Sequence, residues 1–294
     1  MKIAICASEG APYVKSGGLG DVMEALPSAL ARIAGNEVVL FLPYYNKIKT
    51  NTAYMVERVA EIRVQLGWRQ QYCGIMKLTN RNDGVQVYFL DNDYYFGART
   101  GAIYGDMDDG ERFGFFSKAI IEMLPHIGFM PDALHLNDWQ TAMAAALMKL
   151  HYAKMPYFSR IKTILTIHNL RFQGVFDRGF CDELLSLGEA AFDMHKLEFY
   201  GNVNYLKGGI VYADKVTTVS PTYAKEIMTK FYGESLEGVL AERAGDVVGI
   251  LNGIDTVSYD PFTDEALRRN YCPENMSGKA ECKAALQNEL DLDV

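Results

Sequence analysis

The stretch Ile3-Ala-Ile-Cys-Ala-Ser-Glu-Gly-Ala-Pro-Tyr-Val-Lys-Ser-Gly-Gly-Leu-Gly-Asp-Val22 decides how the rest of the chain is interpreted. Residues 3–7 form a short apolar run that is typical of a buried strand, and apolar residues then recur with helical spacing from Val22 to Ile33. The intervening loop, residues 15–21, contains one lysine and three glycines. Glycines let backbone N–H groups approach a ligand closely, and a helix N-terminus attracts anions. The loop therefore predicts a site for a diphosphate.

Two better-known phosphate-binding patterns do not fit this loop. The dinucleotide fingerprint needs its first glycine directly after the strand and a second glycine two residues later, but Gly10 is followed by Ala-Pro-Tyr. A Walker A loop places its lysine after the glycines, whereas Lys15 precedes them. A glycine-rich turn without chemistry is the plain alternative, and the loop alone does not exclude it.

Composition restricts the class of protein. The chain has 294 residues, of which 49% are hydrophobic, so it can bury a sizeable core. A formal charge of −8 and a pI near 5.2 argue against a nucleic-acid or anionic membrane partner. Glu9 comes too early for a signal peptide and no run reaches 18 apolar residues, so we expect a cytoplasmic protein. Five cysteines without a C-x-x-C pair favour free thiols over disulfides or zinc.

The pattern along the chain predicts an α/β fold. We expect a mostly parallel, twisted sheet with helices on both faces and an antiparallel hairpin inserted at about residues 58–90. A polar loop at 91–112 precedes a helix from Phe113, and its acids Asp106, Asp108, Asp109 and Glu111 miss the EF-hand spacing. A second Lys-Gly-Gly at Lys207 lies inside a helical pattern, so we interpret it as close helix packing. The expected strands are 3–7, 37–42, 58–66, 70–79, 85–90, 133–136, 162–167, 215–219 and 247–251, and the later helices are 203–213, 221–229 and 279–290.

Polar residues follow several of the predicted parallel strands. The Lys15 loop follows the first strand, residues 135–140 span the end of another, and His168 with Asn169 follow the next. Asn252 stands in the same position after the last strand. Open α/β sheets bind ligands beyond the carboxyl ends of their strands, so these segments should meet in one crevice. His135, inside its strand, is better explained as a core histidine than as a ligand, and Trp139 as core at the start of its helix.

Several motifs in this order resemble glycosyltransferase family 5, the bacterial glycogen synthases and plant starch synthases, over essentially the whole chain. They are Lys15-Ser-Gly-Gly-Leu-Gly-Asp21, Asp108-Asp-Gly-Glu-Arg-Phe113, His135-Leu-Asn-Asp-Trp-Gln140, Thr166-Ile-His-Asn-Leu170, Tyr212-Ala-Asp-Lys-Val-Thr-Thr-Val-Ser-Pro221 and Gly249-Ile-Leu-Asn-Gly-Ile-Asp255.

The resemblance implies the GT-B architecture, two Rossmann-like domains facing across a cleft. Residues 1–260 would form the N-terminal domain and 261–294 the start of the interdomain linker, with the C-terminal domain absent. The family transfers glucose from ADP-glucose to the non-reducing end of an α-1,4-glucan with retention of configuration, so the expected partners are ADP-glucose and an α-1,4-glucan. Because half of the cleft would be missing, we expect these 294 residues alone to be essentially inactive.

The resemblance also assigns roles to residues. Lys15 corresponds to the lysine that reaches the donor phosphates, and His168 to the histidine that binds the glucosyl 6-hydroxyl and stabilises the oxocarbenium-like centre through its backbone carbonyl. The other positions that it places at the donor and sugar are Gly17, Gly18, Asp21, Tyr104, Asp138, Asn169 and Asn252.

The residues are consistent with front-face displacement. Retaining hydrolases use two carboxylates about 5 Å apart, and Asp138 is the one acid among the strand-end residues. Neither a cofactor nor a metal is expected, because Lys15 and helix dipoles can neutralise a leaving diphosphate. Two alternatives remain: a non-catalytic α-glucan-binding module, and an unrelated Rossmann-type nucleotide enzyme. Leu42-Pro43 stands where an NAD enzyme carries an acid, which disfavours the second.

Overall fold

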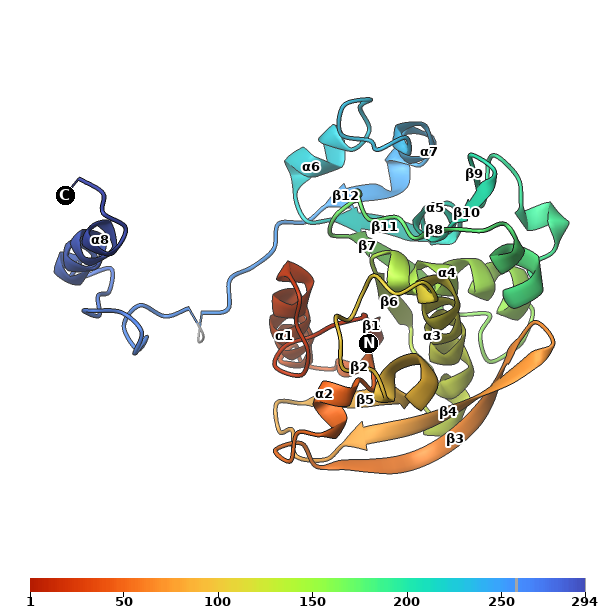
Figure 1. The fold of residues 1–294 in the computed structure, drawn as a ribbon, viewed down its shortest axis with the longest axis horizontal. Coiled ribbons are helices and arrows are strands. Elements are labelled where there is room, and N and C mark those ends of the chain that lie inside the picture. The colour runs from red at the N-terminus through yellow and green to blue at the C-terminus, as the bar shows by residue number, and fades with distance from the viewer. Residues whose placement is uncertain (257–258, 294) are drawn as a thin grey trace. The chain divides into compact units, whose positions relative to one another are not determined.

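The computed structural model describes residues 1–256 and 259–293, which divide into two units (Figure 1). The first unit ends at Asn252 and the second begins at Gly253. The second unit contains the helix α8 (Ser277–Glu289) among its described residues. The sheets and the remaining helices belong to the first unit.

The elements of the first unit are as follows. Its strands are β1 (Lys2–Cys6), β2 (Glu37–Pro43), β3 (Val56–Leu66), β4 (Arg69–Leu78), β5 (Val85–Asp91), β6 (Ala133–Asn137), β7 (Lys162–Ile167), β8 (Val175–Phe176), β9 (Glu198–Phe199), β10 (Asn202–Asn204), β11 (Lys215–Thr218) and β12 (Val247–Gly249). Its α-helices are α1 (Gly18–Ala31), α2 (Asn46–Lys49), α3 (Asp109–Met123), α4 (Trp139–Leu147), α5 (Tyr205–Tyr212), α6 (Pro221–Glu226) and α7 (Glu237–Glu242).

Within the described residues, nine strands form one sheet in the order β12-β11-β7-β6-β1-β2-β5-β4-β3. Neighbouring strands from β12 to β5 run parallel, whereas β4 is antiparallel to both β5 and β3. The mostly parallel sheet and its antiparallel insertion are therefore confirmed. Since β5 is also parallel to β2, the hairpin extends the sheet at one edge and leaves the α/β core uninterrupted.

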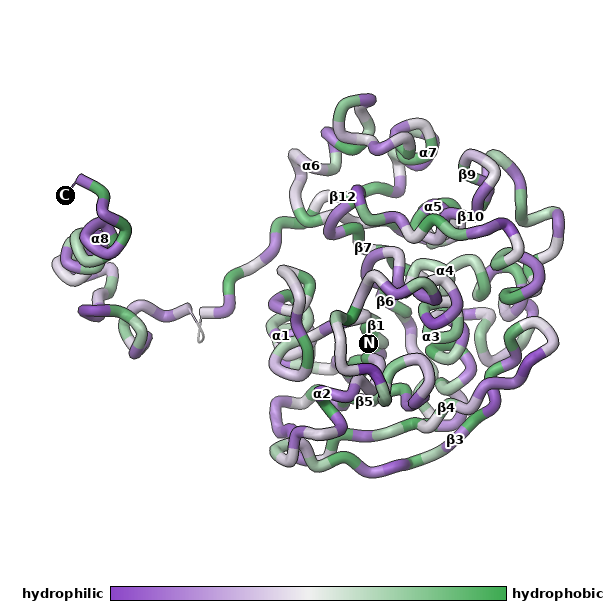
Figure 2. The backbone as a smooth tube through the Cα atoms, viewed as in Figure 1, coloured by the Kyte–Doolittle hydropathy of each residue, from purple (hydrophilic) through white to green (hydrophobic). Residues whose placement is uncertain are grey.

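The burial of each strand follows from its place in the sheet. After their first residues, Lys2 and Glu37, the central strands β1 and β2 are apolar and buried, as expected for strands with helices on both sides. Figure 1 shows α1 on one side of these strands and α3 and α4 on the other. The edge strand β3 instead alternates in hydropathy, and its tube in Figure 2 changes repeatedly between purple and green. Its apolar side contributes Ile62, Val64 and Leu66 to the core.

The structure corrects the prediction at several elements: α2 and α7 were not expected, and β12 and α6 end earlier than the predicted 251 and 229. Helix α3 begins at Asp109 and not at Phe113, because the acids Asp109 and Glu111 favour the first turn of a helix. In addition, β8, β9 and β10 form a small antiparallel sheet that the sequence did not predict, and its last strand takes the first residues of the helix expected at 203–213. Strands of two or three residues are too short to show a hydrophobic period.

The second Lys-Gly-Gly segment is confirmed as a packing feature. A Cβ atom added to Gly208 would lie 2.4 Å from Leu197 Cδ2, and one added to Gly209 would lie 2.6 Å from Ala142 Cβ. Both glycines therefore allow α5 to approach α4 and the neighbouring loop closely. Lys207 donates hydrogen bonds from Nζ to the backbone carbonyls of Met194 and Glu198, so it has a structural role.

Candidate active site

The site forms where the direction of strand progression in the sheet reverses. From β1 the chain proceeds outward through β2 on one side and, later, through β6 and β7 on the other. The carboxyl ends of β1 and β6 are therefore adjacent, and such switch points are where open α/β sheets bind ligands. The Lys15 loop follows β1, Asp138 follows β6, and His168 follows β7.

The Lys15 loop leads directly into helix α1. Gly17 caps the helix and Gly18 is its first residue, so the N-terminal N–H groups of α1 lie within the predicted diphosphate loop. Lys15 Nζ lies 2.5 Å from Asp21 Oδ1 in the first turn, and both side chains are partly exposed. The loop thus combines an ammonium group, an acid and the positive end of a helix dipole.

The glycines of this loop differ in why the fold needs them. A Cβ on Gly20 would lie 2.7 Å from Lys15 Cγ, so Gly20 makes room for the lysine stem. Gly18 has no atom within 4 Å of such a Cβ, and at Gly17 the nearest is Glu9 Oε1 at 3.9 Å. The backbone of Gly17 is extended and open to any residue. Packing in the described residues thus explains Gly20 but gives no reason for glycine at 17 and 18.

Asp138 joins the ends of β6 and β7. Its carboxyl Oδ1 accepts the backbone N–H of His168 at 2.7 Å, and the backbone N–H of Asn169 also donates to this carboxyl group. Asp138 adopts φ 55° and ψ −174°, a backbone region that residues other than glycine rarely populate and that costs about 1–3 kcal/mol. Burial raises the pKa of Asp138 to about 7, the two N–H groups oppose this shift, and the charge of Glu9 adds to it.

His168 is held from a second side by Asn137. Asn137 donates from Nδ2 to the carbonyl of Cys6 at 3.0 Å, and its Oδ1 lies 2.9 Å from His168 Nε2. One buried amide therefore links the end of β1 to the imidazole. Burial lowers the pKa of His168 to about 4, with a smaller contribution from His135. The imidazole is accordingly neutral at physiological pH.

Tyr104 reaches the site from the loop before α3. Its hydroxyl lies 2.7 Å from Ser8 Oγ, directly after β1, and burial raises the pKa of Tyr104 well above its usual value. Glu9, which follows Ser8 in the chain, is 3% exposed and accepts the backbone N–H of Ser16. Sequence reasoning missed Glu9. The signal was present, since Glu9 is an acid shortly after a buried strand, but its approach to Asp138 depends on the sheet order.

The remaining predicted positions lie at the same edge of the sheet. Asn169 is exposed, and its Oδ1 accepts the backbone N–H of Arg171 at 3.1 Å. Asn252 is exposed beyond β12, two strands further out than β7. His135 is confirmed as a satisfied core histidine, because its Nε2 lies 2.6 Å from Thr166 Oγ1 and burial lowers its pKa to about 4.

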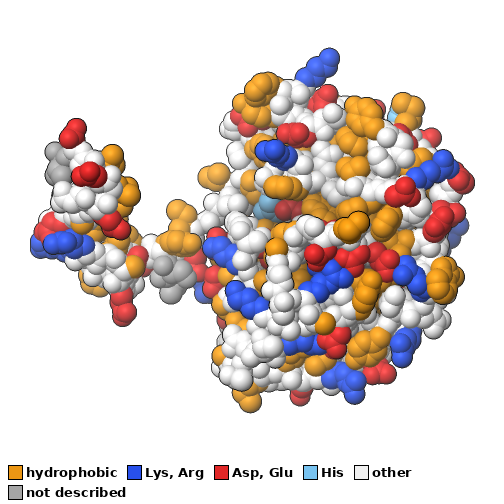
Figure 3. Space-filling view, in the orientation of Figure 1, with side chains coloured by type: hydrophobic (Ala, Val, Ile, Leu, Met, Phe, Trp, Pro, Cys, Tyr) orange, Lys and Arg blue, Asp and Glu red, His pale blue; other side chains and the backbone are white. Residues whose placement is uncertain are grey.

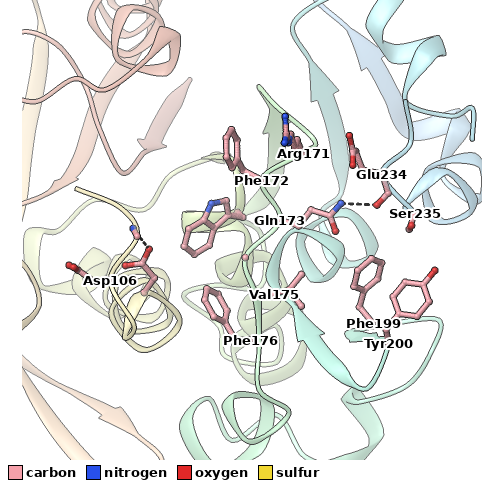
Figure 4. A pocket seen from close by; sticks show the side chains of 14 residues that line it. Asp106, Arg171, Phe172, Gln173, Val175, Phe176, Phe199, Tyr200, Glu234 and Ser235 are labelled. Carbon is pink, nitrogen blue, oxygen red and sulfur yellow. Dashed lines mark hydrogen bonds between the residues drawn. The ribbon is translucent and has the colours of Figure 1, made fainter. Parts of the chain in front are cut away.

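A pocket of about 550 Å³ opens beside these residues. Two of its lining residues are close in sequence to the strand-end residues: Trp139 directly follows Asp138, and Arg171 comes two residues after Asn169. Figure 4 shows aromatic side chains around it, among them Phe172 and Tyr200, and the bond from Gln173 Nε2 to the carbonyl of Glu234, 2.9 Å long. The lining residues are Gly105, Asp106, Asp109, Trp139, Arg171, Phe172, Gln173, Gly174, Val175, Phe176, Phe199, Tyr200, Glu234 and Ser235.

The pocket combines apolar faces with charged edges. Figure 3 shows orange hydrophobic side chains beside a band of red and blue charged side chains on one face of the molecule. Trp139 is held between Phe113 and Phe176, with ring centroids 5.1 and 5.5 Å away. This arrangement suits a ligand with both apolar faces and hydroxyl groups. Sequence reasoning missed most of the lining, because it comes from loops and from the small sheet.

The acids of the loop before α3 are bound by arginines. Arg99 contacts Asp106 at 2.8 Å and Asp108 at 2.5 Å, and the fully buried Arg112 lies 2.7 Å from Asp109. Arg112 also donates to the carbonyl of Ile103 at 2.7 Å. The guanidinium groups thus offset the acidic charge and fix the loop that carries Tyr104 and one edge of the pocket.

Comparison with known proteins identifies the family of the chain. A family model described as the starch synthase catalytic domain matches residues 2–242. The chain belongs to this family. A glycogen synthase of Bacillus licheniformis is 48% identical over 294 residues, covering 100% of this chain and 60% of the relative. The glycogen synthase of Bacillus subtilis is 48% identical over 292 residues, covering 99% and 59%.

A solved starch synthase has the same fold. It is the catalytic domain of starch synthase IV from Arabidopsis thaliana bound to ADP and acarbose, with a TM-score of 0.86 and 32% identity. The match covers 99% of this chain and 59% of that one. The chain spans about 60% of the length of the curated glycogen synthases it matches. Among the described residues, no helix is long and apolar enough to cross a membrane.

Proposed function

We propose that these residues form the N-terminal half of a retaining glucosyltransferase that moves glucose from ADP-glucose to the non-reducing end of an α-1,4-glucan. Family membership and the glycogen synthase relatives support this reaction class. The observation that carries the proposal is the space around Gly17 and Gly18, where packing gives no reason for glycine. These glycines lie beside Lys15, at the same edge of the sheet as Asp138 and His168. Space left open over a helix N-terminus suits a bound anion.

The donor diphosphate would bind the Lys15 side of the site. The N–H groups of Gly17 and Gly18 would donate to phosphate oxygens, and Lys15 would neutralise the charge that grows on the leaving ADP. Asp21 Oδ1 lies 2.5 Å from the lysine ammonium, so it would position Lys15 toward the donor. No metal is required for this step, because the ammonium and the helix dipole carry the positive charge.

The transferred glucose would lie against the ends of β6 and β7. The neutral imidazole of His168 can hydrogen-bond a sugar hydroxyl, and its backbone carbonyl can stabilise positive charge at the anomeric carbon. Asp138 retains lone pairs beyond those used by its two backbone donors, so it can accept from a hydroxyl. Tyr104, Asn169 and Asn252 complete the proposed sugar contacts.

The glucan acceptor would enter through the pocket beside Trp139. Aromatic faces such as Phe172 and Tyr200 can stack on sugar rings, and Asp106, Asp109 and Gln173 can bond their hydroxyls. The solved starch synthase IV was bound to ADP and acarbose. In the transfer, the bond from glucose C1 to the ADP oxygen breaks and a bond to the acceptor hydroxyl oxygen forms on the same face. The acceptor proton passes to the leaving phosphate.

The 294-residue chain alone should be nearly inactive, because its residues would contact the donor from one side only. The first test is an NMR titration of the chain with ADP, followed at the amides of Gly17 and Gly18, together with a glycogen transfer assay using ADP-glucose. We expect ADP to shift both amides and transfer to stay at the level of a Lys15→Ala control. Transfer above that control would contradict the predicted inactivity, and unshifted amides would contradict the donor site.

The alternative is a non-catalytic α-glucan-binding module. The mixed aromatic and polar pocket also supports this function, since a glucan could bind there without any donor. Maltooligosaccharide titrations with and without ADP separate the two proposals. Glucan binding without any ADP binding would favour the module.

A further inference from the structure

Glu9 is a buried acid that the proposed reaction does not use. It lies three residues after β1, and its side chain is 3% exposed. One carboxyl oxygen, Oε2, accepts the backbone N–H of Ser16. The other, Oε1, lies 3.9 Å from the position that a Cβ of Gly17 would occupy. Glu9 is therefore hydrogen-bonded to Ser16 and lies near Gly17, the two residues that precede helix α1.

The same carboxyl group acts on the opposite side of the site. Its charge contributes to the raised pKa of Asp138 and to that of Tyr104. Tyr104 is itself fixed by Ser8, the residue before Glu9, and the Tyr45 hydroxyl donates to the Ser8 carbonyl at 2.9 Å. Glu9 thus lies between the diphosphate loop and the proposed sugar contacts, within a buried, hydrogen-bonded part of the chain.

A carboxyl group in this place calls for an explanation. An amide oxygen could equally accept the Ser16 N–H, and burying a charge costs more than burying an amide. A second acid near Asp138 adds like-charge repulsion. The positive end of the α1 dipole, at Ser16 and Gly17, offsets part of this cost. The negative charge itself is therefore the property that distinguishes Glu9 from a neutral acceptor here.

We propose that Glu9 is a positioning residue that holds the Ser16–Gly18 backbone ready for the donor diphosphate and couples this loop electrostatically to Asp138. The role of Glu9 in positioning the loop for a diphosphate rests on the proposed function. Its coupling to Asp138 does not. The groups that face Asp138 are Glu9 after β1, Tyr104 before α3, and the His168 and Asn169 N–H groups after β7.

The test compares Glu9→Ala and Glu9→Gln in the 294-residue chain, with Glu24→Gln on helix α1 as a matched control. Glu9→Ala removes the acceptor of the Ser16 N–H, so we expect ADP to bind about tenfold more weakly, the effect of one lost hydrogen bond. Glu9→Gln keeps an acceptor and removes only the charge, so ADP affinity should fall much less. Glu24→Gln should bind ADP like the original chain.

The second readout is the titration midpoint of the Asp138 carboxyl carbon by NMR, assigned with Asp138→Asn. Glu9→Gln should lower this midpoint because it removes a nearby negative charge, and a purely structural role would leave it unchanged. An unchanged midpoint in Glu9→Gln, or unchanged ADP affinity in a folded Glu9→Ala, overturns the proposal. If Glu9→Ala does not fold, the titration midpoint of Asp138 in Glu9→Gln decides whether the proposal holds. Absence of ADP binding by the original chain contradicts the proposed function instead, and the midpoint still tests the coupling.

Discussion

The carboxyl Oδ1 of Asp138 accepts the backbone N–H of His168 at 2.7 Å. This bond fixes the loop after β7 to the loop after β6. Asp138 has a positive φ, and its side chain forms no hydrogen bond that caps its own helix α4. Several properties of the site follow from this pair.

Binding of the donor sugar should weaken as the pH falls through about 7. Burial raises the pKa of Asp138 to about 7, so an ionised acceptor of sugar hydroxyls is lost below that pH. If only the ionised form binds, ADP-glucose affinity should fall about tenfold from pH 8 to pH 6. His168, with a pKa of about 4, stays neutral throughout this range. Calorimetric titrations of the chain and of Asp138→Asn check this, and a flat profile is expected for the variant.

The free energy of unfolding of the chain should depend on pH because of Asp138. A carboxyl whose pKa is raised on folding stabilises the folded state fully below its unfolded pKa of about 4, and this contribution is lost as the pH rises to about 7. The loss can reach about 4 kcal/mol for a shift of about three units. Asn keeps a carbonyl oxygen that can accept the His168 N–H and does not titrate, so Asp138→Asn is a fair reference.

Urea unfolding at pH 5 and pH 8 measures this effect. The free energy of unfolding of the original chain, relative to Asp138→Asn, should decrease between the two values. Carboxyls with lowered pKa, such as Asp83 at about 2, lose their contribution only at lower pH and do not interfere. An equal difference at both pH values would show that Asp138 does not titrate in this window.

Gly18→Ala should separate ligand binding from stability. Nothing lies within 4 Å of the added Cβ, and alanine is a better helix residue than glycine by up to about 1 kcal/mol. We expect an unchanged or higher melting temperature and weaker ADP binding, because the methyl group would occupy space that a phosphate needs.

Gly20→Ala is the matched comparison in the same helix. Its Cβ would lie 2.7 Å from Lys15 Cγ, so the lysine stem must move and the chain should lose stability as well as ADP affinity. Should Gly18→Ala bind ADP as tightly as the original chain, glycine at position 18 would need another explanation.

The sequence was sufficient to predict the large, mostly parallel sheet, because apolar runs that alternate with helical segments are typical of parallel strands. It also placed Lys15, Asp138 and His168 at one edge, since parallel strands share a carboxyl end. Three-dimensional contacts were needed for the rest. Glu9 affects Asp138 only because β1 and β6 are neighbours, and Tyr200 reaches the pocket from the turn after β9, a strand of two residues that is too short to show a hydrophobic period.

Lys15→Ala should reduce ADP binding without destabilising the chain. The pair between Lys15 and Asp21 is largely exposed, and such pairs contribute about 0–1 kcal/mol. Lys2, which pairs with Glu37 at 3.3 Å on the surface, provides the control. We expect Lys2→Ala and Lys15→Ala to unfold at similar urea concentrations, with weaker ADP binding in Lys15→Ala only. An equal loss of ADP affinity in both would point to a general charge effect.

Phe172→Ala tests the acceptor pocket. Phe172 lines the pocket with a side chain that is 61% exposed, so its removal should change stability by less than about 1 kcal/mol. An aromatic face that stacks on a sugar ring should contribute more than that to glucan binding, so maltooligosaccharide affinity should fall by about tenfold. Phe231, which is 83% exposed and lies outside the pocket, is the matched control. If Phe231→Ala weakens glucan binding as much as Phe172→Ala does, the acceptor contacts a different surface and the pocket beside Trp139 must serve another ligand.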